Sequence, residues 1–395
     1  MPILPSPDET IMDTVSCKLK LGAWEIDTKD DPRTELLQVL TERGMNSPAG
    51  RCEVSLFVTP AAKPGLLEQA VGAAASALGI GGGGSSGPPK FSMDVRGLAV
   101  AHDDAMEITL SNGDRSAKVM TAKVDRVTGH QGHVRFSGRA TLAAAARART
   151  DRVFLSQGMA QIAGDLATDA GVGTGQIDTG DTYPYFVADT AQTVFDHLLS
   201  LAQLEGMDLY DDADGAIVMR RFAKSGADRK LYHGIHLLDA RVYHDVTACD
   251  RVQVTGEGPS SSGGSQKWHH LLKDPATVQS TAGQGSGARL LARSAARSSD
   301  AVERLAKGRL GAALDGATRG TLRLLGDPTI TLGDAVEVTS APWPEANGVY
   351  KVVHVRHRVV KRDGYVTTLG VTGMGGSDAA GDMLGAALGA VAGLL

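Results

Sequence analysis

The sequence predicts a mainly β protein of the α+β class, in which two related β modules flank a small α/β domain. Residues 104–109 return 230 positions later as residues 334–339, with Asp, Ala, Glu and Thr identical. A second match follows, because residues 132–138 resemble residues 364–370 at an offset of 232. Between the copies the hydrophobic period changes from that of strands to that of helices. Internal repeats indicate duplicated units, although short matches in Val- and Gly-rich strands also arise by chance.

Length and charge limit the kinds of protein that this chain can be. At 395 residues it is too long for one ordinary core, so two or three domains are expected. The net charge is −5, and no face or tail gathers the Lys and Arg that phosphate binding needs. We therefore expect no nucleic acid contact specific to sequence. Cys17, Cys52 and Cys249 form no CxxC pair, which favours buried thiols in a reducing compartment over a zinc site.

The apolar segments predict neither secretion nor membrane anchoring. Residues 1–14 carry Pro and acidic residues and lack the basic-then-apolar order of a signal peptide. Residues 66–80 and 383–395 are too short and too rich in Gly and Ala to span a bilayer of about 30 Å. We expect no stable membrane insertion.

The first domain is predicted over residues 1–150. Residues 15–26 and 51–58 alternate between apolar and polar side chains, as half-buried strands do. An insert at residues 60–90 then interrupts the strands with a short candidate helix and a Gly/Ser-rich stretch typical of a flexible loop. The first β module continues from about residue 91 to residue 142.

A small α/β domain is predicted over residues 151–230. Residues 156–170 place apolar side chains on one helical stripe. A second helix has Asp189 as its expected cap, and Gln192 completes a capping box. Residues 211–215, rich in Asp and Gly, are then expected to form a hairpin turn between two strands.

The same turn has an alternative interpretation as a calcium loop, because an Asp-x-Asp-x-Asp-Gly pattern places oxygens around a hard cation. The spacing does not fit. Tyr210 lies two positions before Asp212, and Arg221 occupies the place of the bidentate Glu. Turn chemistry alone explains these residues, so no metal site is predicted here.

The second β module is predicted over residues 231–376. A Ser/Gly-rich segment at residues 256–290 is expected to be a flexible loop. A helix follows, with Asp300 and Glu303 as its capping box. The remaining strands are expected at residues 318–325, 335–339, 349–357 and 365–371.

No residue pattern points to catalysis, a cofactor or a metal. The near pairs His130/His133, His233/His236 and His354/His357 are poor chelates, since residues i and i+3 of a strand point to opposite faces. Carboxylate pairs such as Asp103/Asp104 exist, but nothing places them in an apolar pocket. We therefore expect no enzyme, no cofactor and no metal.

A Gly/Ala-rich tail at residues 377–395 carries the one candidate contact site. Small residues recur every fourth position, a stripe that lets helices approach closely. The candidate contact residues are Gly381, Gly385, Leu388, Gly389 and Gly393. A flexible tail explains the composition equally well, because each Gly costs a helix about 1 kcal/mol. If the helix forms, it needs a partner, and three copies around a threefold axis would supply one.

Several short segments between residues 90 and 373 carry a family resemblance in matching order and spacing. They are residues 195–206, Leu209-Tyr210-Asp211-Asp212, Gly215, residues 304–310, Gly326-Asp327-Pro328, Leu332-Gly333-Asp334, Gly348-Val349-Tyr350 with Val352, and Gly364-Tyr365. With them the chain resembles the late control D family of phage tails, the baseplate hub proteins that also form the front part of VgrG-type secretion spikes.

The resemblance implies a fold, an assembly and a set of partners. In that family each subunit carries two tube-like β-barrel modules flanking a small α/β domain, and three subunits form a ring of six barrels between a sixfold tail tube and a threefold spike. We therefore expect a non-enzymatic homotrimer, assembled in the bacterial cytoplasm, that contacts a tail tube protein, a spike and other baseplate proteins. VgrG-type spikes continue into an OB-fold and a β-helix, whereas this chain stops soon after Val371, so the spike is expected to be a separate protein. The competing hypotheses are a tail-associated cell-wall hydrolase and a secreted adhesin.

Overall fold

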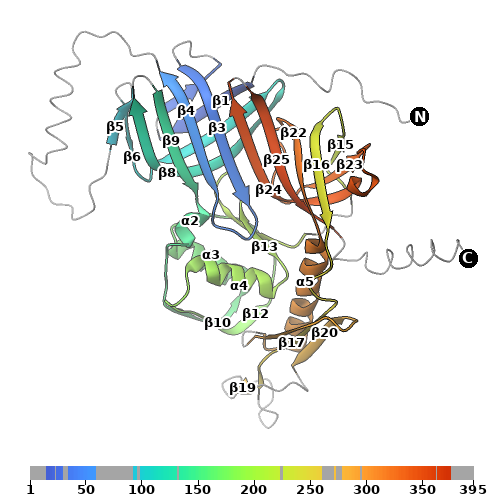
Figure 1. Ribbon diagram of the computed structural model, residues 1–395. Helices are drawn as coiled ribbons and strands as arrows, with labels where there is room; N and C mark the ends of the chain where they lie inside the picture. Colours follow the sequence, from blue (N-terminus) through green and yellow to red (C-terminus); the bar gives the residue numbers. More distant parts are fainter. Residues whose placement is uncertain are drawn as a thin grey trace, which may run out of the picture.

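Most of the β structure lies in one thirteen-stranded sheet, and the helices gather at one end of it (Figure 1). The computed structural model describes residues 15–22, 24–29, 34–58, 92–95, 98–130, 133–222, 226–259, 271–272, 278–293, 296–361 and 363–374. The mainly β fold class expected from the sequence is confirmed. The expected insert at residues 60–90 and the expected tail at residues 377–395 lie outside the described ranges. Among the described helices, none has the length and apolar character needed to cross a membrane.

Two modules with the same strand order make up this sheet. The first contains β1 (Val15–Leu21), β3 (Thr34–Gly44), β4 (Arg51–Val58), β7 (Ala105–Asn112), β8 (Arg115–His130) and β9 (His133–Ala140). The second contains β15 (Arg229–Tyr232), β16 (Leu237–His244), β22 (Thr318–Leu325), β23 (Ala335–Thr339), β24 (Gly348–Val360) and β25 (Gly364–Thr372). In space the orders are β3-β4-β9-β8-β7-β1 and β16-β22-β25-β24-β23-β15, so each strand has a counterpart at the same place. One difference is that β1 runs antiparallel to β7, whereas β15 runs parallel to β23.

Irregularities in the ladders recur at equivalent places in both modules. Leu37 in β3 and Leu238 in β16 are the extra residues of β-bulges against β4 and β22. Asp125 in β8 and Val353 in β24 are bulged in the same way against β9 and β25. Bulges bend and twist a strand locally, so they are positional features and not accidents. The two modules therefore correspond residue by residue along these four strands.

The first sequence repeat marks this correspondence. Asp103 and Gly333 both have positive φ, 68° and 82°, directly before the repeated Asp. Their amides donate equivalent hydrogen bonds, Asp103 N to Val124 O at 2.9 Å and Gly333 N to Val352 O at 3.0 Å. The second sequence match is wrong by one residue. It aligns Phe136 with Thr368, whereas the strand registers align Phe136 with the equally buried Leu369.

Each module has its own apolar core on one face of the sheet. The first core contains Phe136, Met106 and Ile108, all fully buried. The second contains Leu322, Val352 and Leu369, also fully buried. A third core belongs to the helices, and it joins Met159 and Leu198 to Val302 and Leu305 far along the chain. Burying each such side chain contributes about 1.5–3 kcal/mol.

The helical part is built from short elements around that third core (Figure 1). Its helices are α2 (Leu142–Ala145), α3 (Met159–Asp169), α4 (Val194–Leu204) and α5 (Ser299–Ala317). Its strands are β10 (Arg152–Gly158) with β12 (Thr182–Ala188), then β11 (Thr174–Ile177), β13 (Asp208–Asp211) and β14 (Ile217–Arg220), and finally β17 (Arg251–Thr255), β20 (Gln279–Gly283) and β21 (Ala288–Ala292). The small elements left are β2 (Trp24–Asp27), β5 (Ser92–Val95), β6 (Leu98–Ala101), β18 (Gly258–Pro259), β19 (Leu271–Leu272) and the 3₁₀ turn η2 (Pro344–Ala346).

The structure differs from the sequence expectations at the border between the helical part and the second module. The segment 256–290, expected to be a flexible loop, contains β20 and the start of β21. Both strands pair with β17. Because β17 and α5 share the core of α3 and α4, β17, β20, β21 and α5 pack with the middle domain and not with the second module, where the sequence placed them. The Ser/Gly composition resembles that of a loop, but Val278 is buried beside Val252 in this core.

Two helix caps also differ from expectation. Helix α4 is capped by Thr193, whose side chain accepts from Asp196 N while Asp196 accepts from Thr193 N, and not by Asp189. Asp189 instead accepts from the amides of the turn before the helix. Helix α5 is capped by Ser298, two residues before the expected Asp300. Ser and Thr are as good caps as Asp, so composition alone did not decide between neighbours.

Candidate assembly interface

The two modules are joined through one pair of strands, β24 and β3. These strands run antiparallel from His354 opposite Gly44 to Val360 opposite Gln38. Hydrogen bonds from Met45 N to Val353 O at 2.9 Å and from Lys361 N to Leu37 O at 3.0 Å extend the ladder at both ends. The joint makes the strands of both modules one continuous sheet.

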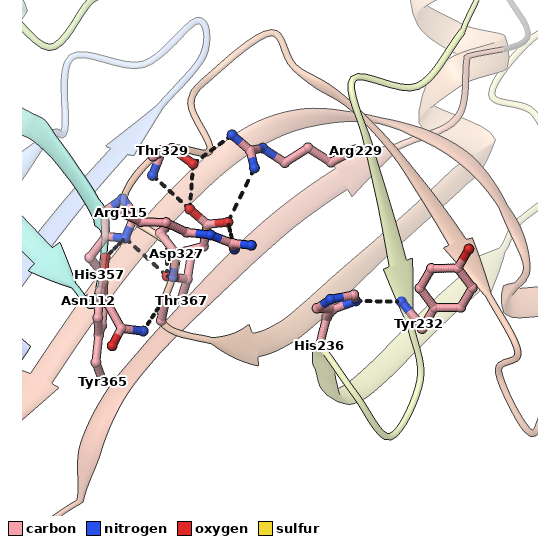
Figure 2. Close-up of polar contacts among 11 residues, drawn as sticks. Asn112, Arg115, Arg229, Tyr232, His236, Asp327, Thr329, His357, Tyr365 and Thr367 are labelled. Atoms are coloured by element: carbon pink, nitrogen blue, oxygen red, sulfur yellow. Dashed lines mark hydrogen bonds and ion pairs between the residues drawn. The ribbon is translucent and has the colours of Figure 1, made fainter. Parts of the chain in front are cut away.

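A buried carboxylate, that of Asp327, supports the joint from the side (Figure 2). It lies in the loop after β22, and Arg115 from the tip of the β7–β8 hairpin donates to it at 2.8 Å. Thr329 N also donates to it at 2.9 Å, and Arg229 lies 3.5 Å away. Burial alone would raise the pKa of Asp327, but the hydrogen bonds from Thr329 and the two guanidinium charges outweigh burial and lower it. The ion pair from Arg115 to Asp327 is a contact between the two modules.

His357 lies beneath the joint, on the core side of β24, and is 2% exposed. Its Nδ1 atom lies 2.9 Å from the Tyr365 hydroxyl and 3.2 Å from Thr367 Oγ1. Its Nε2 atom is buried without a hydrogen-bond partner among the described residues. Burial and the nearby Arg43 charge lower the pKa of His357 from 6.5 to about 3. The imidazole is therefore neutral in the folded protein at neutral pH.

We expect stability to fall on mild acidification because of His357. Below pH 6.5 the unfolded chain binds a proton at His357, whereas the folded chain binds it only near pH 3. The free energy of unfolding therefore falls as the pH is lowered between these two values. At pH 5 the loss is about 2 kcal/mol, since each unit corresponds to about 1.4 kcal/mol. Chemical denaturation of the wild type and of His357→Gln at pH 7 and pH 5 measures it. His357→Gln should reduce the change in the free energy of unfolding between pH 7 and pH 5, whereas His133→Gln, at an exposed histidine, should leave it as in the wild type. An equal change in all three proteins would contradict this account.

Arg43 connects the joint to the helical part. It lies on β3 and is 4% exposed, and it donates to Asp211 O at 3.0 Å and to Thr331 Oγ1 at 3.3 Å. Lys351 on β24 makes an ion pair with Asp208 at the start of β13. Asn46 and Leu209 form two hydrogen bonds: Asn46 N donates to Leu209 O at 2.6 Å, and Leu209 N donates to Asn46 Oδ1 at 2.9 Å. Strand β13 therefore holds both modules at the level of their joint.

The Asp-rich turn between β13 and β14 rests on the first module. Asp212 accepts from the amides of Asp214 and Ala216, both at 2.9 Å, so its carboxylate closes the turn. Thr121 donates to Ala213 O at 2.8 Å, and Lys118 pairs with Asp214. The hairpin interpretation is confirmed by the pairing of β13 with β14. The described residues contain no cluster of three metal-ligating side chains.

A pocket of about 480 Å³, with several charged residues in its lining, lies between α4, α5 and the start of β24. Its most buried acid, Glu205, is 3% exposed and accepts from the Tyr183 hydroxyl at 2.9 Å and from Asp181 N at 3.1 Å. Arg221 donates to its second oxygen at 3.0 Å. Both oxygens of this carboxylate accept hydrogen bonds, which connect the end of α4 to β12 and to the end of β14. Burial and the Glu205 charge raise the pKa of the Tyr183 hydroxyl.

Among the described strands, several edges of the large sheet carry no partner strand, including those of β2 and β15, and two of these edges bear on assembly. One is the end of β8, residues Arg126 to His130, because β7 accompanies β8 only as far as Lys123. The other is the outer edge of β16, which begins the sheet. Near the second edge Tyr243, Val246 and Trp343 are 58%, 94% and 67% exposed. Unpaired edges with exposed apolar neighbours favour association with another chain.

The predicted contact residues and the observed interface do not coincide. Gly381, Gly385, Leu388, Gly389 and Gly393 lie outside the described residues, so the tail stays a prediction. The side chains that hold the joint, Asp327, Arg115, His357 and Arg43, were not singled out as a site. Only Asp327 appeared in the resemblance. No sequence signal links Arg115 to Asp327, since pairs of opposite charges are common and only the fold brings these two together.

The fold is similar to that of solved phage tail proteins. No protein-family model and no curated protein matches the sequence. A 43 kDa tail protein of prophage MuSo2 from Shewanella oneidensis is 12% identical, with a TM-score of 0.63 over 92% of this chain and 100% of that one. A tail protein from Neisseria meningitidis is 13% identical, with a TM-score of 0.60 over 92% and 97%. An Escherichia coli component of the type VI secretion system, described as similar to the T4 bacteriophage tail proteins gp27 and gp5, is 12% identical, with a TM-score of 0.50 over 90% and 76%.

Proposed function

We propose that the protein is a structural, non-enzymatic baseplate hub of a contractile tail or injection system. It forms a homotrimer whose six modules make a ring between a sixfold tail tube and a threefold spike, and it assembles in the bacterial cytoplasm with a tail tube protein, a spike protein and other baseplate proteins. The similarity to tail proteins supports a tail role. The observation that carries the proposal is the joint between β24 and β3, because its two strands have counterparts that end in open edges.

The internal correspondence assigns a counterpart to each half of the joint. Strand β3 corresponds to β16 through the bulges at Leu37 and Leu238, and β24 corresponds to β8 through the bulges at Val353 and Asp125. Repeating the joint between chains places β8 of one subunit against β16 of the next. Such a head-to-tail contact forms a closed ring when its rotation closes.

The register of this contact follows from the register of the joint. Val355 lies opposite Arg43 and Arg356 opposite Glu42. Their counterparts place Val127 opposite His244, and Thr128 opposite Tyr243, across the subunit boundary. The same register sets Arg126 opposite Asp245, a pair of opposite charges, which favours the contact.

Alternate residues of a strand direct their amide and carbonyl groups to the same side, and on both edges the residues that face outward are the ones that this register requires. With His130 opposite His133 at the end of the β8–β9 ladder, we infer that His130 and Thr128 bond toward β9, so Val127 and Gly129 direct their amides to the open edge. On β16, Asp245 N donates to Ala317 O of the β22 side, so His244 and Val242 direct theirs outward. The groups that must pair, Val127 with His244 and Gly129 with Val242, are therefore the outward-facing ones. If the outward-facing residues of the two edges were unrelated, they would lie opposite each other in only about half of all cases.

Electron microscopy of the protein on its spike tests the proposed function. End-on views should contain a ring of three chains with six similar densities, because the duplication turns threefold into approximate sixfold symmetry. The spike is included in the sample, since the ring need not close without it. Views in which the two modules of one chain lie at unequal radii, or rings with another number of chains, would contradict the hub role.

A further inference from the structure

One face of the sheet gathers basic side chains that are far apart in the sequence. On strands β16, β22, β25, β24, β3, β4, β9 and β8, alternate side chains point away from the two cores. The cations on this face are Arg51, Lys123, Arg126, Arg135, Arg139, Arg241, Arg319, Arg323, Arg356 and Arg358. The strands themselves place Asp239, Glu42 and Glu53 there, with Asp125, Asp245 and Asp363 at a bulge or strand end. The sequence expectation that no face gathers Lys and Arg is therefore wrong.

Part of this charge forms a single row across all eight strands. Following directly opposite residues from β16 to β8, the row reads Asp239, Arg323, Thr368, Arg356, Glu42, Arg51, Arg139 and Lys123. We call this set the basic row. At about 4.8 Å between strands it extends over roughly 30 Å.

The basic row places like charges directly opposite one another. Arg51 lies opposite Arg139, and Arg139 lies opposite Lys123. Like charges directly opposite one another destabilise a sheet. Glu42 pairs with Arg51 at 2.9 Å and Asp125 with Arg139 at 3.0 Å. Lys123, Arg323 and Arg356 have no ion pair among the described residues, and the Arg356 Nε atom is buried without a hydrogen-bond partner there.

We propose that the basic row binds the phosphate backbone of double-stranded DNA without reading its sequence. Arginine dominates the row, and its planar fork suits phosphate oxygens. Several uncharged positions on the same face of the neighbouring strands are small, such as Thr321, Gly370 and Ser137, and the exposed aromatic side chain of this face, Tyr243, lies on the edge strand β16. The row contains five cations and two acids, and an extended line of net positive charge fits a long, regular polyanion, whose contacts position it but do not specify a sequence.

The inference goes beyond the proposed hub role and rests on the sheet face of a single chain. If the ring forms as proposed, the module cores lie on one side of the continuous sheet, and the basic rows of the three copies lie together on the other side. DNA binding by a monomer would support the role of the basic row even if the ring does not form.

Fluorescence anisotropy with short DNA duplexes of two different sequences tests the proposal on the full chain. The wild type should bind both equally, and its affinity should fall steeply between about 50 and 200 mM salt. Lys123→Gln combined with Arg323→Gln should weaken binding and lower the salt slope by about 2, roughly 1 for each lost phosphate contact. The matched control is Arg147→Gln with Arg289→Gln, two exposed arginines of the helical part, which should bind as the wild type does.

Three outcomes would overturn the proposal. They are no salt-dependent binding by the wild type, an equal loss in the control, or tighter binding of poly-glutamate than of duplex, which would assign the row to an acidic protein. Thermal unfolding of each variant checks that a loss of binding is not a loss of fold. Light scattering on the same samples reports the number of chains, so a trimer that fails to bind DNA counts against the basic row alone.

Discussion

Replacing Asp327 with Asn should lower the free energy of unfolding by about 3 kcal/mol at pH 7. Breaking a buried ion pair by removing one partner costs about 3–5 kcal/mol, and the lower end applies because Arg115 and Arg229 are partly exposed. The loss arises because two guanidinium groups lose their counter-charge and Thr329 loses a charged acceptor. Chemical denaturation of the purified variant measures it.

The pH dependence of this loss identifies its origin. The folded pKa of Asp327 is lowered, so its contribution is complete above the ordinary value near 3.8 and disappears as pH falls through the folded value. The difference between wild type and Asp327→Asn should therefore be constant from pH 7 to pH 5 and shrink only in stronger acid. The matched control is Asp239→Asn, because Asp239 pairs with Arg241 at an exposed site and should cost less than 0.5 kcal/mol. Equal losses in the two variants would contradict a buried clamp.

The fold class was predictable because most strands of both modules keep simple alternation. Residues 51–58 read as a strand and form β4 with the same bounds, with Cys52, Val54 and Leu56 in the core. The repeat at Asp104 and Asp334 was informative for a physical reason. Both positions follow a residue with positive φ and start a strand at the same place in the module, so the same local chemistry is needed twice.

Strand β3, which forms the joint, was not predicted. Its residues Glu35, Leu36, Gln38, Leu40 and Glu42 are good helix formers, and β-branched residues are few. The bulge at Leu37 shifts the alternation by one, so the apolar side chains do not keep a period of two. Its inward positions also include Arg43, whose buried charge is tolerated only because Asp211 O and Thr331 accept from it. No local pattern carries that information.

The basic row could not be predicted for a related reason. Its five cations lie on five strands and are separated by up to 305 positions, from Arg51 to Arg356, so each of these strands contributes only one of them. Along the chain they alternate with acidic residues, such as Glu53 two positions after Arg51 and Asp125 two positions after Lys123. Charge patterning along a sequence detects runs and helical faces, whereas a row across a sheet depends on register. The register in turn depends on the bulges.

Cysteine crosslinking across the proposed subunit contact should give a covalent ring. Thr128 and Tyr243 are exposed in the single chain and lie directly opposite each other in the proposed register, at a position where the two strands do not hydrogen-bond. Opposite Cα atoms at such positions are about 4.5 Å apart, within the range that a disulfide spans. The native Cys17, Cys52 and Cys249 are buried and should not interfere.

The central claim, that the joint inside the chain is repeated between chains, is tested most directly by oxidising the double variant Thr128→Cys, Tyr243→Cys on the assembled spike. The account predicts a reducible species with the mass of three chains. The control pairs Thr128→Cys with Asp239→Cys, on the same face but four residues along the strand, about 13 Å away, and should stay uncrosslinked. A trimer that gives no disulfide in the first variant, or equal crosslinking in both, would contradict the account.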